Sequence, residues 1–285
     1  MSSAIFNAEN LFFSYGRNAI ITGLNLTVQP GAVIGIVGKN GCGKTTFLKL
    51  VCGFLLAKKG KISISTEDKA AVPSISGVIE TPKLLDNLSG DENLRYYLEK
   101  QYCREKVNAA FKMWQLSEYA DVNVRNYSLG MRQKIGLMIA FLSEAPLLVF
   151  DEPTNSLDFE SVEIFYECVR NASASGRAII IVTHLMYELN KNCTEIFELN
   201  SGKLVKRERK KVDGGSYEIG FIDAGTAQKA AKKLDAPEVL SINGDTLTVS
   251  NSKRSISDLL RAVMEFDVVS VQALESEPVF EGGCQ

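Results

Sequence analysis

A glycine-rich segment has the residue types that bind phosphate. Residues 38–45 read Gly-Lys-Asn-Gly-Cys-Gly-Lys-Thr and fit the pattern G-x-x-x-x-G-K-[ST]. Glycine permits the dihedrals that turn backbone N–H groups toward an anion. Lys44 supplies a cation for the β- and γ-phosphates of a nucleotide, and the Thr45 hydroxyl can ligate Mg²⁺. The pattern predicts an MgATP site. Its expected nucleotide-binding residues are Gly38, Asn40, Gly41, Cys42, Gly43, Lys44, Thr45 and Thr46.

Two carboxylates follow an apolar run further along the chain. The apolar run Leu147–Phe150 has the pattern of a buried strand, and Asp151 and Glu152 follow it directly. Ligands of open α/β sheets bind at the carboxyl ends of strands, so Asp151 is placed to hold Mg²⁺ directly or through water. Glu152 can act as a general base on an attacking water. The alternative is a strand that simply ends in polar residues before a turn at Pro153.

His184 is the single histidine of the chain. It follows the apolar run Ala178–Thr183, which is again the carboxyl end of a predicted buried strand. This position favours a contact with the γ-phosphate, and a structural or surface role is the alternative. We therefore expect three catalytic residues, Lys44, Glu152 and His184.

The elements that must position these groups alternate between strand and helix patterns. Ala32–Val37 is nearly all apolar, as is typical of a strand buried on both faces. Residues from about 84 to 125 have mainly helical patterns. Alternating strands and helices imply a parallel sheet with right-handed crossovers. A helix after the glycine loop is predicted from apolar residues at helical spacing, namely Phe47, Leu48, Leu50, Val51 and Phe54.

The pattern restarts after Gly214 and Gly215. Strand and helix signals then follow in the order β-α-β-β-α-β, with a hairpin at Asn243-Gly244 and a second helix over Ile256–Met264. This order predicts a small α+β domain of the ferredoxin-like type over residues 212–285, after a nucleotide-binding domain over 1–211. The basic run Lys206–Lys211 is interpreted as a linker or a solvated edge strand, and a patch for lipid headgroups or a partner is the alternative.

Composition narrows the class of protein. The chain has 285 residues, 45% hydrophobic and 23% charged, and a formal net charge of −2. These values are typical of a soluble globular protein without a basic field for nucleic acid. No secretory signal or direct membrane span is predicted. The six cysteines are scattered without a CxxC pair, which argues against a zinc site or a disulfide framework and fits a reducing cytosol.

Taken together, these motifs resemble the nucleotide-binding subunits of ATP-binding cassette (ABC) transporters over about residues 4–205. Tyr15 matches the aromatic residue that stacks on adenine. Residues 127–133, Tyr-Ser-Leu-Gly-Met-Arg-Gln, fall where the family carries its Leu-Ser-Gly-Gly-Gln signature. Ser156-Leu157-Asp158 matches the loop after the acidic strand, and His184 matches the switch histidine. The resemblance implies a P-loop ATPase with a mixed sheet, an antiparallel β subdomain and a helical subdomain at about 84–135.

The resemblance also implies a mechanism and partners. Two such domains, a homodimer or a pair with a second ABC subunit, bind head to tail. Each ATP then lies between one phosphate loop and the partner copy's signature, where Ser128 and the N–H of Gly130 contact the γ-phosphate. Closure moves integral membrane permease subunits. The implied location is cytoplasmic, at the inner face of the cell membrane through the permease.

The chain departs from the family pattern in two places. The signature has Tyr127, Leu129 and Met131 where Leu, Gly and Gln are usual, so we expect altered packing at the dimer interface with ATP binding retained. Glu80, in Ile-Glu-Thr-Pro, replaces the usual glutamine that senses Mg²⁺ and the membrane subunit. It can ligate Mg²⁺ but adds negative charge near the γ-phosphate, and a merely solvated side chain is the alternative. This pattern resembles the bacitracin and lantibiotic-immunity exporter branch.

Cys42 lies inside the phosphate loop, where the start of the helix and Lys44 favour a reactive thiol. The alternative is a small residue that the loop tolerates. For the function as a whole, we expect an ATPase that powers a transporter, and the resemblance alone implies an exporter. A non-transport ABC ATPase or a regulatory nucleotide-binding protein with little turnover are the competing hypotheses.

Overall fold

The computed structural model describes residues 4–65, 74–208, 216–234, 239–250, 259, 262–263, 266 and 268–274. The chain forms two compact units, Met1–Arg209 and Lys210–Gln285, and each is described by itself. Residues 209–215, which connect them, lie outside the described ranges. The division into functional domains at 211/212 therefore stays a prediction.

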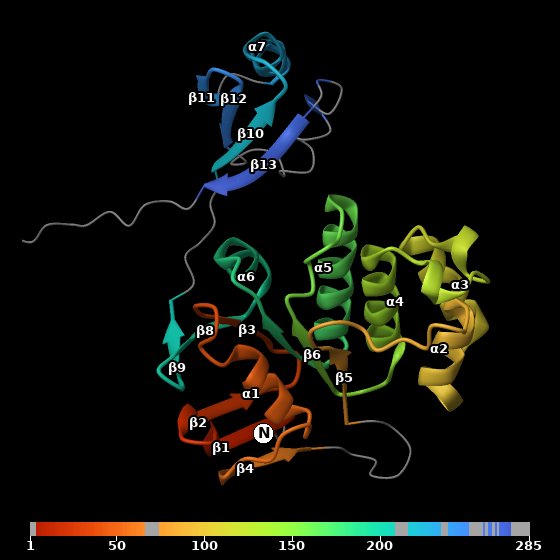
Figure 1. Ribbon diagram of the computed structural model, residues 1–285, viewed down its shortest axis with the longest axis vertical. Helices are drawn as coiled ribbons and strands as arrows, with labels where there is room; N and C mark the ends of the chain where they lie inside the picture. Colours follow the sequence, from red (N-terminus) through yellow and green to blue (C-terminus); the bar gives the residue numbers. More distant parts are fainter. Residues whose placement is uncertain are drawn as a thin grey trace, which may run out of the picture. The chain divides into compact units, whose positions relative to one another are not determined.

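A six-stranded sheet forms the centre of the first unit (Figure 1). Its strand order is β5-β6-β7-β3-β8-β9. Pairing is parallel from β5 to β8, and β9 is antiparallel, so the sheet is mixed as predicted. The strands are β3 (Val33–Val37), β5 (Ile75–Val78), β6 (Leu147–Asp151), β7 (Ala178–Val182), β8 (Glu195–Asn200) and β9 (Lys203–Arg207).

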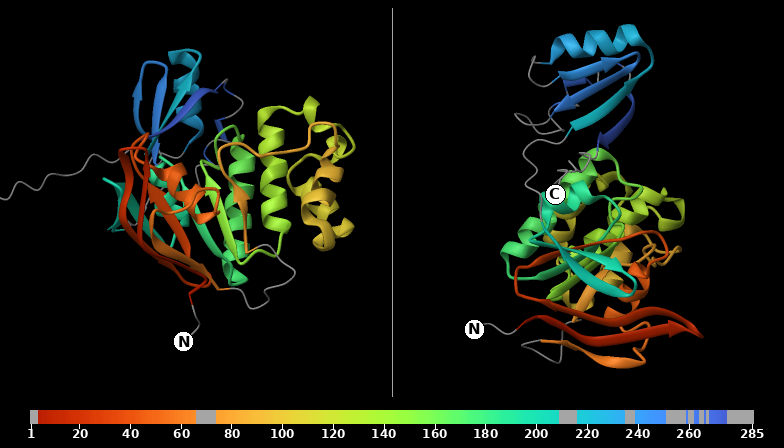
Figure 2. Two further views of the ribbon diagram at one scale, coloured as in Figure 1. Left: turned by 60° about the horizontal axis from the view of Figure 1, so that its bottom comes forward. Right: turned by 90° about the vertical axis from the view of Figure 1, so that its left-hand side faces the viewer.

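A second, antiparallel sheet carries the order β2-β1-β4 (Figure 2). It consists of β1 (Phe6–Tyr15), β2 (Asn18–Val28) and β4 (Lys59–Ile64). Successive side chains of β6 and β7 point to opposite faces of the central sheet. Leu147 and Val149 pack with α1 and the antiparallel sheet, whereas Leu148 and Phe150 pack with the helices of the other side. The central strands are therefore buried on both faces, as their unbroken apolar runs predict.

Helices cover both faces of the central sheet. On one side lies α1 (Lys44–Val51). On the other side α4 (Leu129–Leu142) and α5 (Phe159–Ala174) lie side by side, and α2 (Gly90–Leu98) and α3 (Arg104–Met113) pack on α4 (Figure 1). The short helix α6 (Met186–Asn192) follows β7, and single 3₁₀ turns are η1 (Glu99–Gln101), η2 (Ser117–Tyr119) and η3 (Val124–Asn126). The predicted helical subdomain is thus built around α2, α3 and the start of α4.

The first helix is shorter than its apolar pattern predicts. Phe47, Leu48, Leu50 and Val51 are buried, but the helix ends at Val51 and Phe54 is 71% exposed. Gly53 adopts a left-handed φ of 73°, a conformation that commonly ends helices. The prediction that Phe54 belongs to the buried stripe is therefore wrong.

The basic run after residue 205 begins on an edge strand. Lys206 and Arg207 lie on β9, and they form ion pairs with Glu195 and Glu198 of the neighbouring β8. This part of the run is the solvated edge strand that was predicted. Residues 209–211 of the run lie outside the described ranges.

The second unit is a four-stranded antiparallel sheet with a helix. Its elements are β10 (Ser216–Phe221), α7 (Ala224–Lys233), β11 (Val239–Asn243), β12 (Thr246–Ser250) and β13 (Val268–Leu274). The sheet order β11-β12-β10-β13 is that of the ferredoxin-like fold. Most of the predicted helix over Ile256–Met264 lies outside the described residues, but Leu259 and Val263 are buried.

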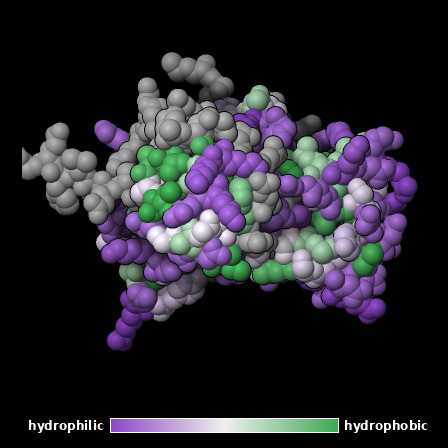
Figure 3. Space-filling model, turned by 90° about the horizontal axis from the view of Figure 1, so that it is seen from above, coloured by the Kyte–Doolittle hydropathy of each residue, from purple (hydrophilic) through white to green (hydrophobic). Residues whose placement is uncertain are grey.

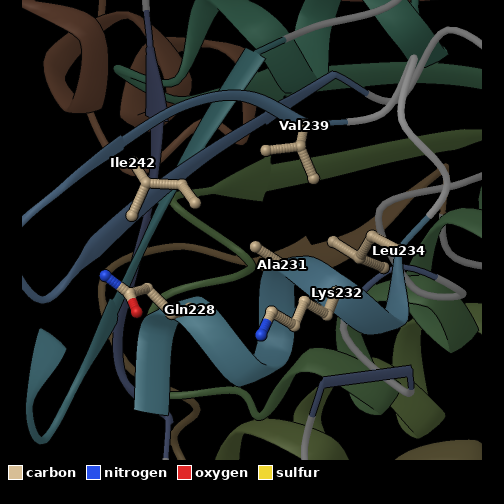
Figure 4. A pocket seen from close by; sticks show the side chains of 6 residues that line it. All are labelled: Gln228, Ala231, Lys232, Leu234, Val239 and Ile242. Atoms are coloured by element: carbon tan, nitrogen blue, oxygen red, sulfur yellow. The ribbon is translucent and has the colours of Figure 1, made fainter. Parts of the chain in front are cut away.

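A shallow groove runs between α7 and β11 in this unit (Figure 4). Its lining is Gln228, Ala231, Lys232, Leu234, Val239 and Ile242.

In the face drawn in Figure 3, hydrophobic groups form small patches between hydrophilic ones. None of the helices that the structure describes is both long and apolar enough to cross a membrane.

Candidate functional site

Four parallel strands bring the predicted site residues to one edge of the central sheet. The order β5-β6-β7-β3 places, in turn, the residues at or just after the end of each strand: Glu80, then Asp151 and Glu152, then His184, then the loop from Gly38. The carboxyl ends of parallel strands meet at the same sheet edge, which is where ligands bind in open α/β folds. Residues more than a hundred positions apart in the sequence are therefore gathered around one loop.

The phosphate loop connects β3 to α1 and depends on its glycines. Gly43, the N-cap of α1, has a left-handed φ of 107°, and a Cβ there would lie 2.6 Å from Ile20 Cγ2. A Cβ on Gly38 would lie 2.7 Å from Cys42 Sγ and 2.8 Å from the Leu199 carbonyl oxygen. The loop thus has no room for larger residues at either end, and it leads directly into a helix N-terminus, a favourable place for an anion.

Lys44 is buried and points back into this loop. Its ammonium donates hydrogen bonds to the carbonyl oxygens of Gly38 at 2.6 Å and Lys39 at 3.2 Å. A buried ammonium needs such partners because desolvation without them is costly. The side chain is consequently held at the centre of the loop, where an anion would meet it.

Thr45 and Asp151 face each other across the junction between α1 and β6. The Thr45 hydroxyl donates to Asp151 Oδ2 at 2.7 Å. Asp151 is buried, and burial raises the pKa of its carboxyl while the Thr45 hydrogen bond opposes that rise. Thr45 and Asp151 are two of the three predicted metal ligands, Glu80 being the third, and the fold places these two in direct contact.

Glu152 and His184 form the next pair along the sheet edge. His184 Nδ1 lies 3.0 Å from Glu152 Oε2 and 3.1 Å from Oε1. Glu152 has a φ of 47°, which is unusual for a residue other than glycine, and its N–H donates to the Val182 carbonyl at 2.8 Å. Such strained backbone is common at functional sites. Two of the three predicted catalytic side chains, Glu152 and His184, therefore contact each other.

Glu80 is paired with a lysine that the sequence interpretation did not single out. Lys49 Nζ donates to Glu80 Oε1 at 2.8 Å. The hydrogen bond from Lys49 lowers the pKa of the Glu80 carboxyl, and the same contact raises the pKa of Lys49, with Tyr15 and Asp151 adding to the rise. Glu80 is thus ion-paired as well as half-exposed, and its role as a Mg²⁺ ligand stays a prediction. The signal for Lys49 was its position one helical turn after Thr45, on the same helix face.

Tyr15 ends β1 and is 51% exposed, with its ring edge-on to Phe13 at 4.9 Å between centroids. Its electrostatic interaction with Lys49 places it near α1. Asn40 is exposed and Thr46 is half-buried. An exposed aromatic ring is what stacking on a nucleobase requires, and the adenine contact of Tyr15 stays a prediction.

The signature segment begins α4. Ser128 is the N-cap, and its hydroxyl accepts from the N–H of Met131 at 3.2 Å. A Cβ on Gly130 would lie 2.6 Å from the Ser156 carbonyl oxygen, so the signature abuts the loop after β6. Gln133 Nε2 adds a hydrogen bond to the Pro153 carbonyl at 3.0 Å. Sequence reasoning missed Gln133 as the residue that ties the signature helix to the catalytic strand end.

Tyr127, the first residue of the signature segment, is buried within its own subdomain. It is 7% exposed and packs in the core, and its hydroxyl donates to the Tyr119 carbonyl. A side chain so buried in its own subdomain has little surface for a second copy. Leu129, by contrast, is 57% exposed and accessible to a partner, and the expected change in packing at the dimer interface stays a prediction.

The cysteine of the loop differs from others in its surroundings. Cys42 lies beside Gly38 in the phosphate loop, at the N-terminal end of α1. Burial raises the pKa of Cys52 to about 11 and that of Cys168 to about 12. Because the thiolate is the reactive form, we expect iodoacetamide to modify Cys42 before those two and to abolish ATPase activity, with ATP protecting. Mass spectrometry and turnover of a Cys42→Ala control check this. Alkylated Cys42 with unchanged nucleotide binding would contradict it.

Comparison with known proteins decides the family. The ABC transporter family model matches residues 21–155. The Nod factor export ATP-binding protein I of Ralstonia nicotianae is 30% identical over 86% of this chain and 81% of its own length. The chain belongs to the ATP-binding proteins of ABC transporters. It is an ATPase subunit that powers transport, and neither competing hypothesis is needed.

One further relative and one solved structure bear on the branch of the family and on the fold. The lantibiotic transport ATP-binding protein SrtF of Streptococcus pyogenes is 28% identical over 69% of this chain and 87% of its own length. A solved ATP-binding subunit of an ABC transporter superposes with a TM-score of 0.66 at 26% identity, covering 71% of this chain and 89% of that one. The predicted fold class and the resemblance to the lantibiotic exporter branch are confirmed.

Proposed function

We propose that this ABC ATPase powers export and that its working unit is a head-to-tail pair at the inner face of the cell membrane, docked on permease subunits. Two observations support export, namely the names of the Nod factor and lantibiotic relatives and the Glu80 substitution. The exported substrate is chosen by the membrane partner. The observation that carries the catalytic part of the proposal is the gathering of Lys44, Asp151, Glu152 and His184 at one sheet edge.

The same geometry supports Mg²⁺ as the cofactor. A hydroxyl and a buried carboxylate, Thr45 and Asp151, contact each other at 2.7 Å, and Mg²⁺ is usually bound by one or two carboxylates together with nucleotide phosphates. The residues present fit the ion, with Glu80 as a further oxygen ligand. When bound, Mg²⁺ neutralises charge on the transferring phosphoryl group.

The protein's own groups do the remaining work. Lys44 binds the β- and γ-phosphates together with the loop N–H groups, and Tyr15 stacks on the adenine. Glu152 accepts the proton of the attacking water, and His184 holds the Glu152 carboxylate and contacts the γ-phosphate. Ser128 and Gly130 of the second copy complete the site, at the N-terminus of α4. ATP favours the closed pair because it binds that state better than the open one.

A change at Ser128 tests the head-to-tail pair. Asp is as good an N-cap as Ser, so Ser128→Asp keeps the cap of α4 but sets a negative charge against the γ-phosphate of the second copy. We expect this variant to bind ATP normally in its own loop, to lose the ATP-dependent dimer and to lose turnover at least tenfold. Light scattering after size exclusion, with and without MgATP, measures the dimer.

Ser128→Asn is the matched control for that experiment. It also caps the helix well but carries no charge, so it should dimerise more like the wild-type chain. If Ser128→Asp and wild type dimerise equally with ATP, Ser128 does not face the nucleotide of another copy.

A further inference from the structure

Glu80, the residue that departs from the family pattern, forms an ion pair with Lys49. Lys49 stands in the last turn of α1, the helix that follows the phosphate loop, and Glu80 stands two residues after β5 with a left-handed φ of 60°. Their charged groups are 2.8 Å apart, and the side chains are 30% and 53% exposed. The contact joins the phosphate-loop helix to the segment that leads into the helical subdomain.

Several other charged groups lie near the Lys49–Glu80 pair. Three carboxylates, Glu80, Asp151 and Glu152, lie at the carboxyl ends of the neighbouring strands β5 and β6, at the edge where the negative phosphates of ATP are proposed to bind. Asp151 interacts electrostatically with Glu80 and Glu152, and with Lys44 as a cation. Lys44 is directed to the loop carbonyls of Gly38 and Lys39. Lys49 forms the ion pair with Glu80, and Lys83 also interacts with Glu80 electrostatically.

We propose that Lys49 is a positioning residue for nucleotide binding, which holds the Glu80 carboxylate on α1 and offsets its charge against the phosphates of ATP. The proposal rests on the MgATP site proposed above and adds a residue to it. A glutamine at position 80 would need no such counter-charge, whereas a glutamate does. Lys49 thus makes the acidic residue of this chain compatible with an anionic substrate.

The two effects of removing Lys49 can be separated. In the wild-type chain, Lys49→Met removes a positive charge and also releases a carboxylate beside the phosphates. In an E80Q background it removes only the positive charge. The loss of affinity for Mg²⁺-free ATP should therefore be larger in the first case, by about threefold for a half-exposed pair at low salt. Mg²⁺ should shrink this difference, because the cation screens the released carboxylate or binds it.

The experiment is a double-mutant cycle on the full chain. Affinity for a fluorescent ATP analogue is measured for wild type, K49M, E80Q and K49M/E80Q, in EDTA and in Mg²⁺, at low salt. K49R keeps the charge and should restore wild-type affinity. If only the lysine methylenes mattered, K49M would bind as well as K49R, because both side chains keep an aliphatic stem. K206M is the control for net charge, since Lys206 has an ion pair of its own with Glu195 on the sheet edge, and it should leave the affinity unchanged.

The outcomes discriminate between this inference and the site it rests on. A K49M penalty that is larger in the wild-type background than in E80Q, and smaller with Mg²⁺, supports the role of Lys49. Equal penalties in both backgrounds overturn it, since Lys49 then acts without Glu80. If the wild-type chain and K44A bind the analogue equally weakly, the phosphate loop itself is not the site, and both proposals fail.

Discussion

Glu152→Gln should reduce ATP turnover by at least a hundredfold while leaving ATP affinity within about threefold of wild type. A general base contributes about 10²–10⁴ in rate, and glutamine keeps the size of the side chain but cannot accept the proton. The Glu152 side chain is near-isosteric with its replacement, so the contact with His184 Nδ1 at 3.0 Å can persist as a hydrogen bond. Steady-state phosphate release and equilibrium binding of a fluorescent ATP analogue measure the two quantities.

The same variant should accumulate as a dimer in MgATP. In the proposed head-to-tail pair, bound ATP stabilises closure and hydrolysis reverses it, so a chain that binds but cannot hydrolyse ATP stays closed. Glu160→Gln is a suitable control, since Glu160 lies in the first turn of α5 and bonds to exposed Gln115. Near-normal turnover of the Glu152 variant would remove this residue from the base role, whatever the dimer does.

Lys44→Ala should weaken ATP binding by about 10- to 100-fold. A hydrogen bond to a charged group contributes about 1.5–3 kcal/mol, and tenfold in affinity corresponds to about 1.4 kcal/mol. Lys44 is buried with its ammonium at the centre of the loop, so no neighbouring side chain can take its place. Titration with the fluorescent ATP analogue gives the affinity directly.

Lys39→Ala is the matched control for the loop. Lys39 lies in the same segment and has an exposed side chain, while its backbone carbonyl, which the change keeps, accepts from Lys44. The control should lose little affinity. Equal losses in both variants would mean that the effect is one of general charge rather than of the Lys44 position.

Those parts of the site that depend on local chemistry were predictable from sequence. Gly38–Thr45 is a contiguous motif, and its fixed positions Gly38, Gly43, Lys44 and Thr45 follow from what phosphate and Mg²⁺ binding need. Asp151, Glu152 and His184 could be found because each ends an unbroken apolar run, and such runs predict strands of a parallel sheet whose carboxyl ends meet. The contact of Thr45 with Asp151 follows from the same topology.

Contacts between side chains from separate elements were not predictable. The pairing of Lys49 with Glu80 joins residues 31 positions apart, and no periodicity in the sequence reports it. Tyr127 could not be assigned to the core from its motif, because burial depends on how α2, η2 and α4 pack together. Phe54 was misplaced for a local reason, since the left-handed Gly53 outweighs an apolar residue at the right spacing.

The most direct test of the account is complementation between two defective chains. Lys44→Ala and Ser128→Asp are each introduced into a Glu152→Gln background, and dimerisation in MgATP is measured by mass photometry for each chain and for the mixture. If each site combines Gly38–Thr46 of one copy with Ser128–Gly130 of another, the mixed pair has one intact site. The account predicts dimers in the mixture and few in either chain alone. A mixture that stays monomeric, or a Ser128→Asp chain that dimerises alone, would contradict it.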